Sequence, residues 1–299
     1  MAKCIICGDE ITAVNKEHII PFSLGNKNFT INAICRECNS LLGEKIDDET
    51  ANSILAKVFR QQNGIPGHSG KIPNAFAEGV GENGEIIRLS KDFKPTIVTK
   101  VSVDDNKIHY QGSSKEEAIE IANKKLKRKK LPQLTEEQKN EIMTKEPEKY
   151  QPTISYNFSL NLNKINLEWI KIAYETLYYL FGEKIFAEKS IMELRQILYE
   201  YLYNDTYDEK IIQGKVGFID KSLQQIIDNL NQNLDFLKKT LNDSVVHLIG
   251  VISENNELRI MIQVEGMLTG AVRVTVNDSS IYESATLMIG YPSGEIINQ

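Results

Sequence analysis

The residues that offer the most chemistry lie together near the N-terminus. Two cysteine pairs of equal spacing, Cys4 with Cys7 and Cys35 with Cys38, frame this segment, and the rest of the 299-residue chain contains no cysteine. A disulfide scaffold would spread its bridges over the fold, so four clustered thiols favour a metal site. Two residues between thiolates let both sulfurs reach one ion, and four thiolates close a tetrahedral zinc site. The frame therefore predicts a structural Zn²⁺ ion.

Four polar residues lie inside this frame or directly beside it. Glu17 and His18 are adjacent between the pairs, Asn32 precedes the second pair and Asn39 follows it. The imidazole of His18 titrates near neutrality and can take a proton from water. Glu17 and Asn39 offer oxygen atoms, which suit a hard ion such as Mg²⁺ or Mn²⁺. Each residue alone also fits a solvated side chain, a turn or a helix cap, so it is their joint placement that indicates a metal-assisted hydrolytic site.

The stretch "EHIIPFSLGN" followed by "INAICRECN" resembles the motif of the HNH endonuclease family in its treble-clef, ββα-metal form. The resemblance covers the first fifth of the chain. It implies that His18 is the general base and that Glu17 and Asn39 hold the catalytic ion. It also implies that Asn32 bonds to the backbone of the loop that carries His18 and orients the imidazole.

Three positions depart from the family pattern. The acid is Glu17 where aspartate is commoner, and the third motif residue is Asn39 rather than histidine. Leu42 stands where the family often has a lysine. Leucine removes a contact with phosphate that the lysine would make, so we expect another basic residue to make that contact.

Composition describes an ordinary globular chain. Hydrophobic residues make up 41% and charged residues 25% of the sequence, and the net charge is -6. No apolar run is long enough to span a membrane, and the N-terminus lacks the apolar stretch of a signal peptide, so we expect a cytoplasmic protein. The acidic balance argues against coating nucleic acid by bulk charge but permits a local basic face.

Periodicity and turn residues predict an α+β fold. A zinc-stapled ββα-metal module over 1–60 is followed by a strand-rich extension over 61–132 that ends in a basic helix. A linker over 133–152 leads to an α+β C-terminal domain over 153–299. Within these parts we expect a helix from Arg36 to about Arg60, an unbroken strand over 95–103 and a strand over 153–164. We also expect an amphipathic helix over Lys221–Leu241.

The basic helix end places six cations within seven residues: Lys124, Lys125, Lys127, Arg128, Lys129 and Lys130. Cations at a helix C-terminus complement its dipole, but six exceed that need. The cluster is the best candidate for contacts to a phosphate backbone, with a solvated face as the alternative. Among the other histidines, His68 is a candidate to line the substrate groove, whereas His109 and His247 are expected to be structural.

These features predict a metal-dependent endonuclease that acts on nucleic acid, with DNA favoured over RNA. The alternatives are an RNase and a zinc module that binds nucleic acid or protein without catalysis. By resemblance alone, a role in phage defence or a mobile element is plausible. The C-terminal domain is expected to bind substrate, a defence-system partner or a second copy. The target, the trigger and the oligomeric state stay open.

Overall fold

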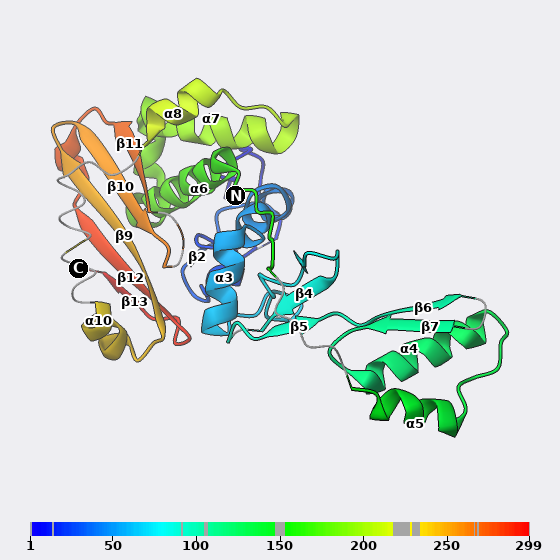
Figure 1. Cartoon of the computed structure of the whole chain (residues 1–299). Coiled ribbons are helices and arrows are strands. Elements are labelled where there is room, and N and C mark those ends of the chain that lie inside the picture. Colours follow the sequence, from blue (N-terminus) through cyan, green and yellow to red (C-terminus); the bar gives the residue numbers. More distant parts are fainter. Residues whose placement is uncertain are drawn as a thin grey trace. The chain divides into compact units, whose positions relative to one another are not determined.

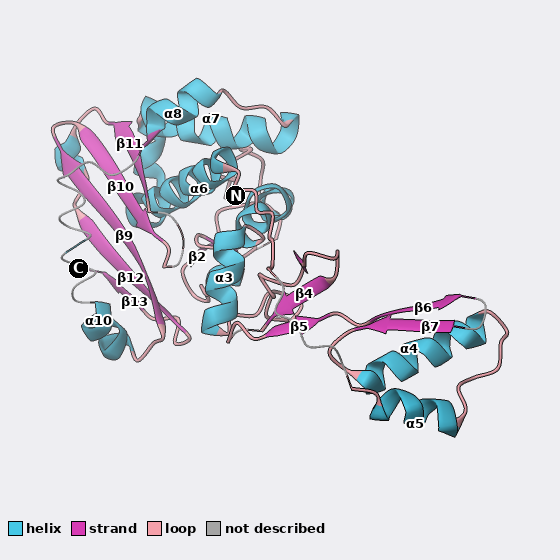
Figure 2. Cartoon of the chain, in the orientation of Figure 1, coloured by secondary structure: helices cyan, strands magenta, loops and turns pink. Residues whose placement is uncertain are grey.

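The computed structural model describes residues 2–13, 15–90, 92–104, 107–146, 153–217, 228, 234–265, 267 and 269–298. The chain forms two compact units. Unit 1 comprises Met1–Pro73 and Ser159–Gln299, and unit 2 comprises Asn74–Phe158. Helices and strands occur in both units, which confirms the predicted α+β class (Figure 2). None of the described helices is long and apolar enough to cross a membrane.

The N-terminal part of unit 1 is a small hairpin followed by a broken helical run. In chain order the elements are β1 (Glu17–His18), η1 (Phe22–Leu24), β2 (Thr30–Ile31), α1 (Arg36–Leu42), the π-helical turn η2 (Gly43–Asp47), α2 (Asp48–Ala51) and α3 (Ile54–Asn63). The continuous helix predicted from Arg36 to about Arg60 is wrong. Ser53 adopts an extended conformation and its hydroxyl accepts from the Ala56 N–H, so it starts a new helix.

The second part of unit 1 packs helices on a six-stranded antiparallel sheet (Figure 1). The helices are α6 (Leu162–Phe181), η3 (Gly182–Ala187), α7 (Lys189–Asn204), α8 (Glu209–Lys215), η4 (Ser279–Ile281) and α10 (Leu234–Leu241). The strands are β8 (Val216–Gly217), β9 (Val245–Glu254), β10 (Glu257–Gln263), β11 (Gly270–Thr275), β12 (Ala285–Tyr291) and β13 (Ile296–Asn298), in the spatial order β13-β12-β9-β10-β11-β8. Helix α6 contacts β10 and β11, while Leu241 of α10 packs on side chains of the opposite face of β9. Nearly all of the predicted helix before Leu234 lies outside the described residues.

One hydrophobic core joins both parts of unit 1. Buried side chains of the hairpin, the cysteine segment, α6, α7 and the sheet form a single cluster. Hydrogen bonds also link the two parts. The Tyr174 hydroxyl donates to the Ile5 carbonyl (2.6 Å), and Arg195 Nε donates to the Ile6 carbonyl (2.7 Å). The N-terminal module is therefore folded against α6 and α7. The domain boundaries expected from the sequence stay a prediction.

The described residues of unit 2 form two small sheets and two helices. Strands β3 (Gly79–Val80), β4 (Ile86–Leu89) and β5 (Pro95–Ile97) form one sheet, and β6 (Lys100–Asp104) pairs with β7 (Lys107–Gln111) in the other. They are followed by α4 (Lys115–Arg128) and α5 (Glu136–Thr144). The strand predicted over 95–103 is thus split between two sheets, and the expected linker contains α5, which Thr135 and Gln138 start with a capping box. Over 153–164 the only described pairing is a single bridge from Ser155 to Val80, and α6 already begins at Leu162.

His247 on β9 joins the sheet to the N-terminal module, which confirms the structural role predicted for it. The side chain is fully buried, its Nε2 lies 2.9 Å from the Leu24 carbonyl and its Nδ1 accepts from the Glu265 N–H at 3.1 Å. Both ring nitrogens are therefore satisfied only in the neutral form, with the proton on Nε2. Burial lowers the pKa of His247 to about 4.

This arrangement predicts a pH-dependent stability. The folded pKa lies below the unfolded value of about 6.5, so the fold favours the neutral ring and loses stability as the pH falls. Between pH 7.5 and 5.5 we expect His247 to cost about 1.4 kcal/mol of unfolding free energy. Urea unfolding of the wild type and His247→Gln at both pH values measures this difference. His109→Gln, on exposed β7, serves as the control and should keep the wild-type pH dependence; an unchanged dependence in His247→Gln would contradict the assignment.

Candidate active site

The four cysteines meet at one point, as their spacing predicts. Their sulfur atoms all lie within 4.8 Å of one another, and the Cys7 and Cys35 sulfurs are 3.7 Å apart. A tetrahedral site with Zn–S bonds of about 2.3 Å has sulfur–sulfur edges of about 3.8 Å. The donor set therefore fits a zinc ion.

Backbone groups near the cysteine cluster favour thiolates, whereas burial opposes them. Backbone N–H groups of Asp9, Cys35 and Cys38 donate to cysteine sulfurs at 3.3–3.5 Å. A hydrogen bond with Cys38 lowers the pKa of Cys4 to about 4, whereas burial raises the pKa of Cys7 to about 12. Four thiolates packed this closely repel one another, so a cation is needed to hold them all ionised.

Glu17 is buried at the start of the hairpin, where the cysteine segment and α6 enclose it. Only 3% of its surface is exposed. Its Oε2 accepts from Asn39 Nδ2 at 2.5 Å, and its Oε1 lies 2.9 Å from the ammonium of Lys171. Asn39 is in the first turn of α1, which begins directly after Cys35. The structure thus brings Glu17 and Asn39 together, as the motif predicts.

His18 is half-buried on β1, and in the described part of the chain no hydrogen bond holds either of its ring nitrogens. Burial lowers the pKa of His18 below its ordinary value, and the positive charges of Lys171 and Lys16 lower it further. The ring therefore favours the neutral form near neutral pH. A neutral imidazole with a free nitrogen is the form that a general base requires.

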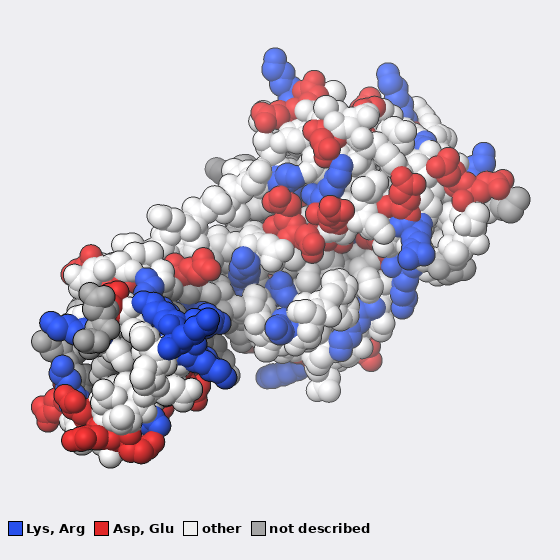
Figure 3. All heavy atoms as spheres, turned by 90° about the vertical axis from the view of Figure 1, so that its right-hand side faces the viewer, with Lys and Arg blue, Asp and Glu red and all other residues white. Residues whose placement is uncertain are grey.

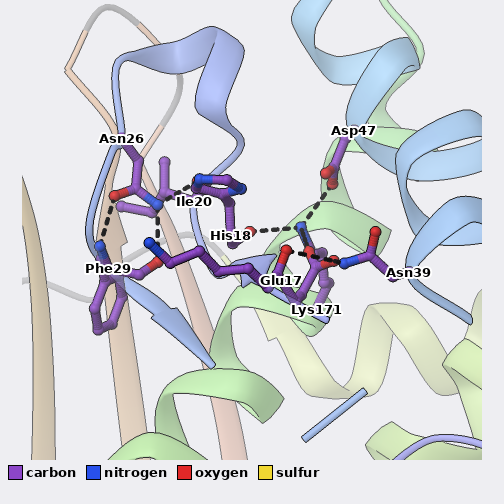
Figure 4. A network of polar contacts seen from close by, with 9 residues as sticks. Glu17, His18, Ile20, Asn26, Phe29, Asn39, Asp47 and Lys171 are labelled. Carbon is purple, nitrogen blue, oxygen red and sulfur yellow. Dashed lines mark hydrogen bonds and ion pairs between the residues drawn. The ribbon is translucent and has the colours of Figure 1, made fainter. Parts of the chain in front are cut away.

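Asn26, not Asn32, braces the loop that follows His18 (Figure 4). Asn26 is fully buried; its Nδ2 donates to the carbonyls of Ile20 (2.6 Å) and Phe29 (2.8 Å), and its Oδ1 accepts from the Phe29 N–H (2.9 Å). Asn32 is exposed, and among the described residues it makes no hydrogen bond with this loop. The structure thus places Asn26, and not Asn32, in hydrogen bonds with the backbone of this loop. The signal in the sequence was the Gly25-Asn26 pair, because asparagine at a turn commonly bonds to nearby backbone.

Two further charged residues reach the site, and the motif alone did not indicate them. Lys171 comes from the middle of α6, and Asp47 is the last residue of η2. The Lys171 ammonium lies 2.7 Å from Asp47 Oδ1 and donates to the His18 carbonyl at 3.0 Å (Figure 4). Although burial lowers the pKa of Lys171, the surrounding carboxylates raise it well above the ordinary value, so the amine is charged.

Glu17, His18, Asn39 and Asp47 line one cavity of about 490 Å³. Its lining also includes Lys16 and His68. The ring of Phe22 stands between the two histidines, with centroids 5.7 Å from His18 and 5.1 Å from His68. The cavity therefore combines a neutral imidazole with carboxylate and amide oxygens, as a metal-assisted hydrolase requires.

Residues 4–55 match the protein-family model described as HNH endonuclease. This segment is an HNH endonuclease domain. The match covers the whole cysteine cluster and the Glu17–His18 strand, and so indicates a nuclease that binds nucleic acid. Searches of curated proteins and of solved structures gave no significant match to the chain.

The predicted basic cluster belongs to unit 2, at the end of α4, and all six cations are exposed. Lys125 and Lys129 donate to the Val101 and Val103 carbonyls, both at 2.6 Å, and Lys124 pairs with Glu120 at 3.7 Å. The side chains of the other three (Lys127, Arg128 and Lys130) have no hydrogen bond or ion pair within the described part of unit 2. Figure 3 shows Lys and Arg gathered on one part of the surface, with Asp and Glu close by. Contact with nucleic acid here stays a prediction.

Zinc content tests the cysteine cluster. We expect the purified chain to hold one Zn²⁺ per molecule, and Cys7→Ser to lose most of it because one of four ligands is removed. Elemental analysis and thermal unfolding measure both effects, and excess Zn²⁺ should restore part of the lost thermal stability. A Cys7→Ser protein with wild-type zinc content and melting temperature would rule out the site.

Asn26 and Asn32 form a matched pair of variants. Asn26→Ala removes the side-chain partner of the Ile20 carbonyl and the Phe29 N–H and one of two partners of the Phe29 carbonyl, so we expect a loss of about 2–4 kcal/mol in unfolding free energy. Asn32→Ala removes an exposed side chain and should stay within about 0.5 kcal/mol of the wild type. Urea unfolding distinguishes them, and equal effects would contradict the loop-bracing role of Asn26.

Proposed function

We propose that the chain is a metal-dependent endonuclease that hydrolyses phosphodiester bonds in DNA. The observation that carries the proposal is the meeting of Glu17, His18 and Asn39 at one solvent-accessible cavity beside the cysteine cluster. The HNH endonuclease match over residues 4–55 supports the reaction class, and the choice of DNA as the substrate is a further step of the proposal.

His18 acts as the general base in this scheme. Its neutral ring takes a proton from a water molecule, which then attacks phosphorus as the bond to the leaving oxygen breaks. The contact of the His18 carbonyl with Lys171 and the pairing of β1 with β2 fix the backbone that carries the ring. A positioned base contributes about 10²–10⁴-fold to the rate.

Glu17 and Asn39 are the residues that would hold the divalent ion. Their side chains already touch, and the Asn39 amide needs only a rotation of its terminal group to present Oδ1 beside Glu17 Oε2. A bound Mg²⁺ or Mn²⁺ supplies positive charge to the phosphate as negative charge develops on it. The Asp47 carboxylate lines the same cavity and strengthens the preference for a cation there.

Cutting of plasmid DNA tests the proposal. With Mg²⁺ or Mn²⁺ present, we expect the wild type to nick or linearise supercoiled plasmid, and His18→Ala to lose at least about 100-fold in rate because the base is removed. His109→Ala, in unit 2, is the control and should keep cutting. Chelation of the divalent ion should stop the wild-type reaction.

The same assay separates the rival functions. Faster cutting of an RNA of matched sequence would assign an RNase. An intact plasmid that the protein retards on a gel would assign a binding module without catalysis. Cutting that survives His18→Ala unchanged would refute the general base.

A further inference from the structure

Lys171 connects the C-terminal half of the chain to the HNH domain. It lies on α6, and 153 residues separate it in sequence from His18. Its ammonium has three oxygen neighbours: Glu17 Oε1 at 2.9 Å, Asp47 Oδ1 at 2.7 Å and the His18 carbonyl at 3.0 Å. The contacts with Asp47 and with the His18 carbonyl are hydrogen bonds, and the contact with Glu17 is an ion pair.

The three partners of Lys171 come from different elements of the site. Glu17 and His18 form strand β1, and Asp47 ends the π-helical turn η2. Without the ammonium, two carboxylates would face each other at the edge of the cavity with nothing to offset their repulsion. The contacts therefore set the distance between β1 and the helical run that begins at the second cysteine pair.

Direct contact of Lys171 with substrate is excluded by its burial. None of its surface is exposed, whereas Glu17, His18 and Asp47 all line the cavity. The side chain thus acts on a phosphate only through the residues that it holds.

The geometry points to Lys171 as a positioning residue of the nuclease site. It holds the carboxylate of Glu17 and the backbone of His18 in the positions that the reaction requires. This inference rests on the proposed nuclease function. The ammonium occupies Oε1 of Glu17 and leaves Oε2, beside Asn39, for a divalent ion. The HNH domain therefore depends on α6 for its active geometry.

Lys171→Met tests the inference in the zinc-loaded full-length chain. We expect kcat for plasmid cutting at saturating Mn²⁺ to fall about 100-fold, because a displacement of about 1 Å costs this much. KM for DNA should change less than about threefold, since Lys171 does not touch substrate. The chain has four histidines, so imidazole NMR resolves them individually. The His18 signals should shift, and those of His247 should stay in place.

Glu175→Gln is the matched control for replacing a buried ionisable side chain of α6. Glu175 is one turn beyond Lys171 on the same helix and is fully buried; its carboxylate oxygens have no hydrogen-bond partner among the described residues. Burial raises its pKa well above the ordinary value, so glutamine imitates its protonated form. We expect this variant to keep kcat within about twofold and to leave the His18 signals unshifted.

The outcomes separate the two proposals. A wild type that cuts, with Lys171→Met cutting within twofold of it, overturns the positioning role and leaves the nuclease intact. A wild type that does not cut overturns the nuclease, and the His18 signals then still decide whether Lys171 positions the ring: a shift confined to His18 supports the role, and unshifted signals overturn it.

A second variant covers the case in which Lys171→Met does not fold. Asp47→Asn removes the charge of one of the three partners and keeps an oxygen acceptor for the ammonium, so we expect a smaller fall in kcat, about 3–10-fold. Asp47→Asn with wild-type kcat and unshifted His18 signals overturns the inference.

Discussion

The ion cluster around Lys171 is the interaction on which the site depends. Removing an ammonium from water costs several kcal/mol, and close, well-oriented acceptors must offset that cost. Lys171 meets the condition with two carboxylates and a carbonyl, all within 3.0 Å. A buried pair of this kind contributes little net stability, but loss of one partner leaves an uncompensated charge. It therefore serves to fix geometry more than to hold the fold together.

Two further carboxylates lie near the ammonium, and their protonation keeps the cluster balanced. Glu168 and Glu175 flank Lys171 on α6 and are buried. Burial raises the pKa of Glu168 to about 8 and raises that of Glu175 well above its ordinary value. Burial thus favours the protonated form of both. Burial also raises the pKa of Glu17, whose carboxylate differs from theirs because it contacts the ammonium and lines the cavity.

The sequence revealed the local parts of the site and missed the distant ones. The cysteine pairs, Glu17, His18 and Asn39 were predictable because their chemistry depends on spacings of a few residues. Lys171 was not, since its partners lie more than a hundred residues away. The sequence did contain one signal for Lys171, because a charged residue between Ile170 and Ile172 in an apolar helix needs buried partners. The strand expected over 95–103 fails for a related reason: hydrophobic alternation indicates strand but not which sheet the strand joins.

Charge at the cavity gives the divalent ion of the proposed function a part in binding as well as in chemistry. Its lining includes four carboxylates and the ammonium of Lys16. The carboxylates belong to Glu17, Glu44, Asp47 and Asp48. Such a site attracts cations and repels phosphate. Leu42 replaces the lysine often found in the family, and buried Lys171 cannot take its place at the phosphate. In the proposed function a bound divalent ion would reverse the local sign and so admit the phosphate, and affinity for the rest of the nucleic acid would have to come from basic residues outside the cavity.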